Sequence, residues 1–248
     1  MPPAPFQGNG YSEDWGNVSG FPRGGRSSYH LVMRFPVIRP AMPPLGRWAG
    51  MLAEAYEAKR FSNFGLLSVR LEASLVAAWG GEHTACVLTS SGTAAIAAPL
   101  IARGVTGPVL LPAFTFPATL AAIKMAGAEP VLVDVCPTSW AVAPESLDVA
   151  FIATGARAAV VLAPFGLRTD LAPHARVAER HGAVLVIDDA AGLGVERSCL
   201  ETMPWVYEAY SLHATKPFSI GEGGAVFAHR SVEEPLRRAI NFGLPNPD

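Results

Sequence analysis

The sequence predicts an α/β fold with a mostly parallel sheet of about seven strands and helices on both faces. Short apolar runs without two-residue alternation, such as Pro108–Leu111 and Ala183–Ile187, alternate with helical stretches along most of the chain. Strands of this kind are buried on both faces, which is typical of parallel sheets covered by helices. Hydrophobic residues make up 50% of the 248 residues, so the chain can bury a sizeable core and is not a disordered protein.

The N-terminal part of the chain differs in composition from the rest. Eight Pro and eight Gly fall within the first 50 residues, where apolar periodicity is weak. We therefore expect residues 1–47 to form an extended arm, of a kind that is often ordered only against a partner. Residues 48–248 are expected to form one large domain.

The order of elements follows from the apolar periodicity. A helix is expected from about Trp48, a turn at Phe61–Gly65 and a second helix at Ser68–Trp79. Strands are expected at Ala85–Leu88, Pro108–Leu111, Pro130–Val135, Ala158–Pro164, Ala183–Ile187, Ala209–Leu212 and Gly224–Ala228. Further helices are expected at Ala94–Ala102, Phe116–Met125, Pro144–Ile152, Leu171–His181 and Val232–Ile240. Right-handed crossovers place the carboxyl ends of parallel strands on one edge, where ligands bind, so polar residues that follow strands are the candidate site residues.

Charge and missing motifs argue against several classes of function. A net charge of −2 gives no basic field that would attract nucleic acid or anionic membranes. No run of about 18 apolar residues could span a bilayer. The motifs GxGxxG, GxxxxGKS/T, GxSxG and HExxH are absent. Their absence argues against dinucleotide-dependent dehydrogenases, P-loop ATPases, α/β-hydrolases and zincins.

The cysteines bear on metal binding and location. Cys86, Cys136 and Cys199 are far apart and lack the spacing of a zinc site. Sparse thiols fit a reducing compartment, and the sequence does not begin with a compact signal peptide. We therefore expect a cytoplasmic protein without a metal site.

The segment Ser90–Thr93 links a predicted strand to a predicted helix. Gly92 permits close approach of a ligand to the backbone, the hydroxyl groups of Ser91 and Thr93 can donate hydrogen bonds, and a helix N-terminus favours an anion. These features indicate a phosphate site. The alternative is that the serine only caps the helix, and for this segment taken alone the cap is favoured.

Two further polar features follow predicted strands. Asp188 and Asp189 come directly after Val184–Ile187, where a buried carboxylate needs a cation or hydrogen-bond donors. A helix cap or a salt bridge is the alternative for this pair. Lys216 stands between an apolar strand and the glycine-rich segment Gly221–Gly224, and partial burial would favour its neutral, nucleophilic amine.

Together these residues match the parts of a site for pyridoxal 5'-phosphate (PLP). Lys216 would form a Schiff base with the cofactor, Asp189 would pair with the pyridinium nitrogen, and Ser91–Thr93 with Ser211 would bind the phosphate. Each feature is weak alone, but the set in this order is specific.

The sequence also resembles the DegT/DnrJ/EryC1/StrS family, fold-type I enzymes that use PLP to aminate keto-sugars attached to nucleotides. The resemblance runs from about Phe35 to the C-terminus. It rests on the segments Arg39-Pro40, Asn63-Phe-Gly65, Ser91-Gly-Thr-Ala-Ala95, Pro112-Ala-Phe-Thr-Phe-Pro-Ala-Thr119, Pro130-Val-Leu-Val-Asp134, Asp188-Asp-Ala-Ala191, Ser211-Leu-His-Ala-Thr-Lys216 and Gly221-Glu-Gly-Gly224.

The resemblance implies a fold-type I large domain and a role for each matching residue. Lys216 would carry the cofactor and move a proton between substrate and cofactor, and Asp189 would keep the pyridine nitrogen protonated. Ser91–Thr93 and Ser211 would bind the phosphate. Phe116 would stack on the cofactor ring, although without the resemblance an ordinary core aromatic is an equal alternative.

The resemblance further implies a homodimer with the site at its interface. Glutamate or glutamine would donate an amino group to a nucleotide-linked keto-sugar or a keto-cyclitol, as in amino-sugar, polysaccharide or antibiotic biosynthesis. Family members continue into a small C-terminal domain that we do not find here, and Gly192 stands where they have Gln or His. A PLP-binding or partner-binding regulatory or scaffold protein is therefore one alternative. The other is a PLP-dependent sugar dehydratase or lyase, although such dehydratases replace the lysine at position 216 with histidine.

Overall fold

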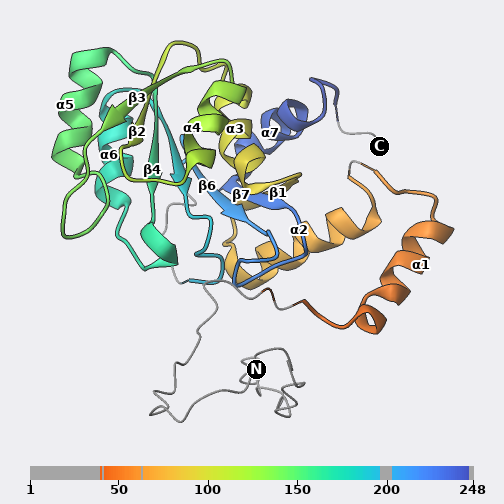
Figure 1. Ribbon diagram of the computed structural model, residues 1–248. Helices are drawn as coiled ribbons and strands as arrows, with labels where there is room; N and C mark the ends of the chain where they lie inside the picture. The colour runs from red at the N-terminus through yellow and green to blue at the C-terminus, as the bar shows by residue number, and fades with distance from the viewer. Residues whose placement is uncertain (1–39, 41, 63, 196–202, 246–248) are drawn as a thin grey trace, which may run out of the picture. The chain divides into compact units, whose positions relative to one another are not determined.

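Seven strands form one sheet in the computed structural model, which describes residues 40, 42–62, 64–195 and 203–245 (Figure 1). The strands are β1 (Thr84–Thr89), β2 (Pro108–Pro112), β3 (Glu129–Val133), β4 (Ala158–Leu162), β5 (Val184–Asp188), β6 (Val206–Ser211) and β7 (Gly224–His229). They lie in the order β1-β7-β6-β5-β4-β2-β3. Strand β7 is antiparallel to both of its neighbours, whereas every other adjacent pair is parallel. The predicted mostly parallel, seven-stranded sheet is thus confirmed.

Helices connect the strands and cover both faces of the sheet. They are α1 (Ala49–Glu57), α2 (Leu66–Trp79), α3 (Gly92–Ala102), α4 (Pro117–Met125), α5 (Pro144–Thr154), α6 (Ala172–Arg180) and α7 (Glu233–Ile240). Short 3-10 helices occur at Leu45–Arg47, Pro164–Gly166 and Arg230–Val232. The part of the predicted N-terminal arm that precedes residue 40 lies outside the described residues, as does Cys199.

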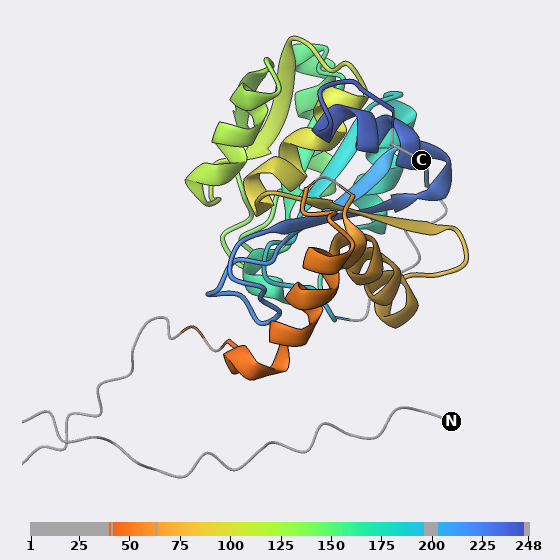
Figure 2. The same ribbon diagram turned by 90° about the vertical axis from the view of Figure 1, so that its right-hand side faces the viewer.

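The core has two sides, which are separated by the sheet. On one side, α3, α4 and α7 pack against alternate residues of the central strands, such as Val160 and Val186. On the other side, α5 and α6 pack against the intervening residues Val161 and Leu185. Helix α2 covers the same side at β1, β6 and β7 through Leu75, and Figure 2 shows it across the sheet from α3 and α7. Continuous apolar strands are explained by this burial on both faces.

One strand begins earlier than its sequence indicates. We predicted Ala209–Leu212, but β6 spans Val206–Ser211. Glu208 interrupts the apolar run, yet the Tyr210 hydroxyl donates a 2.8 Å hydrogen bond to its carboxylate. This bond satisfies a polar side chain within the strand, so the apolar pattern alone places the start of β6 too late.

Candidate active site

The carboxyl ends of six strands meet along one edge of the sheet and bring the predicted site residues together. Strands β1 to β6 all run in the same direction, because β7 is antiparallel to both β1 and β6. Ser91 follows β1, Phe116 follows β2, Asp188 ends β5, and Ser211 ends β6 with Lys216 in the loop beyond it. Loops at this edge lie along the lower side of the sheet in Figure 1. Such an edge is where ligands bind in parallel α/β sheets.

The predicted phosphate segment packs closely against the ends of β6 and β7. A Cβ added to Gly92 would lie 2.8 Å from Ser211 Cβ and 3.2 Å from Ser211 Oγ. A Cβ added to Gly224 would overlap the Ser91 carbonyl oxygen and Thr89 Oγ1. Only glycine fits at these two close approaches, and together they place the hydroxyl of Ser211 beside the first turn of α3.

Ser91 serves as the N-cap of α3. Its Oγ accepts a 3.2 Å hydrogen bond from the backbone N–H of Ala94, so the capping alternative is confirmed for this residue. The hydroxyl hydrogen of Ser91 stays available to donate to a ligand. The unpaired N–H groups of the first helical turn favour an anion at the same place, and the phosphate role of Ser91–Thr93 remains a prediction.

Asp188 is a buried carboxylate at the end of β5, with 4% of its surface exposed. Thr119 Oγ1 donates a 2.7 Å hydrogen bond to Asp188 Oδ2. Burial raises the pKa of Asp188, and the Thr119 bond, the backbone N–H of Ala190 and the positive charge of Lys216 act in the opposite direction. The lysine is therefore near enough to influence this carboxylate.

Asp189 is also buried, with 2% of its surface exposed. Its backbone N–H donates to the Ala209 carbonyl of β6 at 2.9 Å. Its carboxylate lies over Gly192, and a Cβ added there would overlap both Asp189 oxygens. Gly192 thus leaves the space in which this carboxylate sits, which gives a physical reason for glycine where the resembling family has a larger side chain.

Lys216 lies in a loop whose two arms are hydrogen-bonded to each other. Leu212 and Ala214 on one arm donate backbone N–H groups to Gly223 and Gly221 on the other, each at 2.9 Å. Gly221 has φ +101°, a conformation that favours glycine. Lys216 itself is half-buried, and its backbone N–H donates to the His213 carbonyl at 2.8 Å. The glycine-rich segment Gly221–Gly224 therefore shapes the loop that carries the lysine.

Phe116 is not a core aromatic. It precedes α4 as its N-cap residue, and 75% of its surface is exposed. An exposed aromatic ring at the ligand-binding edge fits the predicted stacking role, which stays a prediction. Sequence reasoning gave no role to Thr115 or Thr119, although both lie in the segment that carries the family resemblance.

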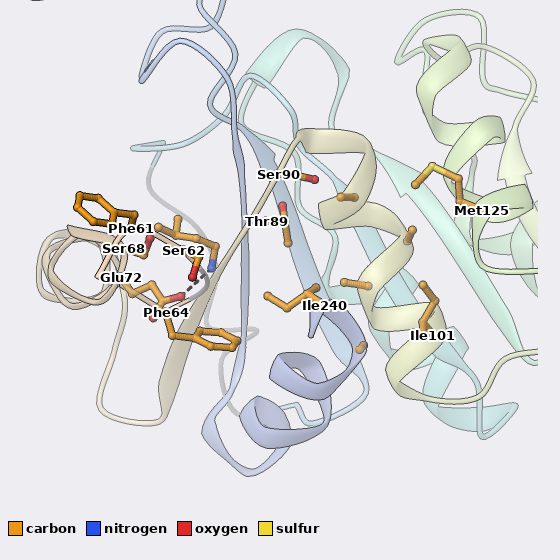
Figure 3. Close-up of a pocket in the computed structure, with 15 residues that line it drawn as sticks. Phe61, Ser62, Phe64, Ser68, Glu72, Thr89, Ser90, Ile101, Met125 and Ile240 are labelled. Carbon is orange, nitrogen blue, oxygen red and sulfur yellow. Dashed lines mark hydrogen bonds between the residues drawn. The ribbon is translucent and has the colours of Figure 1, made fainter. Parts of the chain in front are cut away.

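A separate pocket of about 500 Å³ lies along α3 (Figure 3). It extends from Thr89 and Ser90 at the end of β1 to Ile240 on α7. Glu72 on its wall accepts a 2.9 Å hydrogen bond from the backbone N–H of Leu88. None of the predicted cofactor residues lines this pocket. One lining residue, Ser90, precedes the predicted phosphate residue Ser91 in the sequence.

Neither a metal cluster nor a membrane-spanning helix is found among the described residues. No group of three or more His, Cys, Asp or Glu side chains there could hold a metal ion. No helix in this part of the chain is both long enough and apolar enough to cross a bilayer.

Comparison with known proteins identifies the family. Residues 47–246 match the DegT/DnrJ/EryC1/StrS aminotransferase family. The chain belongs to this family. Its sequence is 30% identical to dTDP-4-amino-4,6-dideoxy-D-glucose transaminase of Shigella dysenteriae, over 84% of this chain and 56% of that protein. It is 35% identical to L-glutamine:2-deoxy-scyllo-inosose aminotransferase of Streptomyces fradiae, over 65% of this chain and 40% of that protein.

Solved structures confirm the fold of the family. The chain matches the structure of DesI in the presence of its TDP-sugar product with a TM-score of 0.74 and 29% identity, covering 83% of this chain and 52% of that one. It matches a PLP-dependent aminotransferase from Bacillus cereus with a TM-score of 0.75 and 26% identity, covering 83% and 58%. The DegT/DnrJ/EryC1/StrS chain described here spans about half the length of the relatives it matches.

Proposed function

We propose that this chain provides the PLP-binding part of an aminotransferase that acts on the keto group of a sugar or cyclitol, with glutamate or glutamine as amino donor. The observation that carries the proposal is the convergence of three features at one sheet edge. These features are the hydroxyl groups at the start of α3, a buried pair of aspartates at the end of β5, and Lys216 after β6.

The residues at this edge fit PLP. Gly92 approaches Ser211 so closely that a Cβ at position 92 would collide with the serine side chain, which holds the Ser211 hydroxyl beside the first turn of α3. Hydroxyl groups beside a helix N-terminus are suited to a phosphate. Asp189 is buried at the adjacent strand, where a positively charged ring nitrogen would stabilise its carboxylate.

Lys216 and Asp189 perform the chemical roles in this proposal. When bound, PLP supplies an aldehyde that combines with amines and a pyridine ring that accepts electrons. Lys216 Nζ would hold the cofactor until an amino donor takes its place there. The freed amine would then take a proton from the substrate carbon and deliver it to the carbon of the cofactor that was the aldehyde, as base and acid in turn. The Asp189 carboxylate holds the proton on the ring nitrogen, so that the ring remains an effective electron acceptor.

The other predicted residues bind and orient. The hydroxyl groups of Ser91, Thr93 and Ser211 donate hydrogen bonds to the phosphate, and the N-terminus of α3 adds a favourable dipole. The exposed Phe116 ring would pack on one face of the cofactor and would keep water from that face. Orientation of this kind accounts for a large part of enzymatic rate enhancement.

The relatives support the substrate class. The two aminotransferases named above act, by their names, on a dTDP-linked amino sugar and on an inosose with L-glutamine. A second copy of the chain would complete the site in a cytoplasmic homodimer. Exposed apolar side chains of α1, namely Met51, Leu52 and Tyr56, support burial against a partner.

A regulatory role is the alternative that a specific observation favours. The chain is also 31% identical to the pleiotropic regulatory protein of Geobacillus stearothermophilus, over 72% of this chain and 48% of that protein. A regulator on this scaffold would bind PLP without transferring an amino group. The dehydratase alternative is less well supported, because Lys216 is present at the position of the proton carrier.

The donor half-reaction separates the proposal from its alternatives. The PLP-loaded protein is mixed with L-glutamate or L-glutamine without a keto-sugar, and the cofactor is released and identified by mass. We expect conversion to pyridoxamine phosphate together with release of the keto acid. Bound PLP that stays unconverted with both donors would contradict the proposal and support the regulatory role.

A further inference from the structure

We propose that Asp188 is a positioning residue, which holds Phe116 over the cofactor ring through a chain of two threonine hydroxyls, the inner one fully buried. This inference rests on the proposed function, because it assumes that PLP binds at the sheet edge. It assigns a task to Asp188, Thr119 and Thr115, which the mechanism above does not use.

The three residues form a directed hydrogen-bond chain. Thr119 Oγ1 donates to Asp188 Oδ2 at 2.7 Å, and Thr115 Oγ1 lies 2.7 Å from Thr119 Oγ1. A threonine hydroxyl has one hydrogen, and that of Thr119 is used on the carboxylate. Thr115 must therefore donate to Thr119, so the chain runs from Thr115 through Thr119 to Asp188. Thr119 is fully buried and Asp188 nearly so, which shields the bond between them from competing water, and Thr115 at the outer end is half-buried.

The two threonines of the hydrogen-bond chain lie on either side of Phe116 in the sequence. Thr115 directly precedes Phe116, and the backbone N–H of Thr119 donates to the Phe116 carbonyl at 3.1 Å. Pro117 follows at the first position of α4, where its ring restricts the backbone. Anchoring the two threonines to β5 thus sets the position of the Phe116 backbone relative to the end of that strand.

Phe116 needs such an anchor because its own ring is largely exposed. An exposed ring gains little packing that would hold it in one place. A carboxylate is a costly way to anchor a helix end, since burial of a charge is unfavourable and an apolar contact would serve for stability alone. Asp188 directly precedes Asp189, so the end of one strand positions both the ring-stacking residue and the partner of the ring nitrogen.

The test compares Thr119→Val with Thr119→Ser. Valine keeps the shape of threonine but removes the donor, whereas serine keeps the hydroxyl. For Thr119→Val we expect roughly tenfold weaker PLP binding, which is the size expected for one lost hydrogen bond to a charged group, and reduced visible circular dichroism of the bound cofactor. Thr119→Ser should behave like the unchanged protein in both measurements.

A double-variant comparison separates positioning from general stability. If the chain acts through Phe116, Thr119→Val should have little further effect on PLP binding in a Phe116→Leu background. Thr115→Val leaves the inner bond intact and should change PLP binding in the same direction by a smaller factor, which provides a readout if Thr119→Val does not fold.

Three results would overturn the inference while leaving the proposed function intact. The first is unchanged PLP affinity and dichroism in Thr119→Val, and the second is a full, additive effect of that change in the Phe116→Leu background. The third is unchanged PLP binding in Thr115→Val, which decides the matter if Thr119→Val does not fold. Failure of the unchanged protein to bind PLP at all would overturn the proposed function and this inference with it.

Discussion

Two buried acids of this molecule, Glu72 and Asp188, are held in different ways. Glu72 in α2 is 5% exposed and accepts from Arg237 of α7 at 2.8 Å and from the backbone N–H of Leu88 at 2.9 Å. Asp188 is 4% exposed but accepts from the neutral hydroxyl of Thr119, with the charge of Lys216 acting in addition. One acid is neutralised by a guanidinium in direct contact, and the other lies in the candidate active site.

The difference distinguishes an acid that is paired within the fold from one that lies in the candidate active site. The Glu72–Arg237 pair connects α2, β1 and α7, and Arg237 also lies over the Phe64 ring. In this arrangement the charge of Glu72 is paired within the fold by Arg237, which also binds Glu233 at 2.9 Å. At the sheet edge, Asp188, Asp189 and Lys216 lie near one another. Among the described residues, no guanidinium contacts Asp188 in the way that Arg237 contacts Glu72. A bound cofactor with both a phosphate and a basic nitrogen suits that arrangement.

The largest effect is expected from Asp189→Asn. The variant should still bind PLP, but its donor half-reaction should slow by about 10³-fold or more, because a neutral pyridine accepts electrons poorly. Rapid-mixing absorbance measurements with L-glutamate or L-glutamine give the rate. Asp188→Asn is the matched control, since its amide oxygen can still accept from Thr119, and its rate should fall far less. Equal losses in the two variants would contradict the assignment of the ring nitrogen to Asp189.

Replacement of Arg237 should lower the stability of the fold and should not slow the reaction itself. Arg237→Met leaves Glu72 buried without its guanidinium partner, which should cost about 3–5 kcal/mol of unfolding free energy. The melting temperature should fall by roughly 6–20 °C for a protein of this size. The double variant Glu72→Gln/Arg237→Met should recover part of the loss. A single variant with unchanged stability would show that the pair is not needed for folding.

A side chain at position 192 should displace the Asp189 carboxylate directly. In Gly192→Ala the new Cβ would overlap the Asp189 carboxylate, so the carboxylate must move and we expect roughly tenfold weaker PLP binding, equivalent to overpacking by about 1–2 kcal/mol. Titration of the apoprotein with PLP measures this. Gly50→Ala in α1 is the control, because no atom lies within 4 Å of its added Cβ. Equal affinity in both variants would mean that the Asp189 carboxylate is free to adapt.

The smallest effect concerns the pH dependence of stability. His174 is buried in α6, and its Nε2 lies 2.7 Å from the Val142 carbonyl oxygen. Burial lowers the pKa of His174, and the bond to Val142 and the charges of Asp170 and Glu145 partly oppose this. The neutral form therefore stabilises the fold fully above the ordinary pKa of 6.5, and this contribution is lost as the pH falls below that value, because the unfolded chain binds the proton more tightly.

Melting curves at pH 7.5 and 5.5 check this contribution. The melting temperature of the unchanged protein should fall more between the two pH values than that of His174→Gln, whose amide can also donate to the Val142 carbonyl. Equal decreases in the two proteins would show that other groups, such as the His181–Asp148 pair at 2.8 Å, account for the acid sensitivity.

The elements, and the placement of the candidate site residues beside them, could be predicted because their signals are local. Apolar runs indicate buried strands, and residues such as Ser91 and Asp189 come within two positions of a strand end. Partnerships between distant residues could not be predicted in this way. Thr119 and Asp188 are 69 positions apart, and Glu72 and Arg237 are 165 apart. The placement of β7 between β1 and β6 likewise depends on long-range pairing that leaves no periodic signal.

The exposure of Phe116 shows the same limit of local patterns. Its neighbours in the sequence are compatible with either a core aromatic or a ligand-facing one, since aromatic residues dominate both settings. Only the three-dimensional arrangement places it at the open start of α4. The same arrangement shows that the Asp189 carboxylate occupies the space beside Gly192. No local sequence pattern could show this contact.

Borohydride reduction of the PLP-treated protein, followed by peptide mass analysis, tests the central claim most directly. The chain contains three lysines, Lys59, Lys124 and Lys216, and the first two are exposed. A pyridoxyl group on the peptide that contains Lys216, absent from the Lys216→Arg variant, is the predicted result. A label on Lys59 or Lys124 in its place, or no stable label at all, would contradict the assignment of the active site to the carboxyl edge of this sheet.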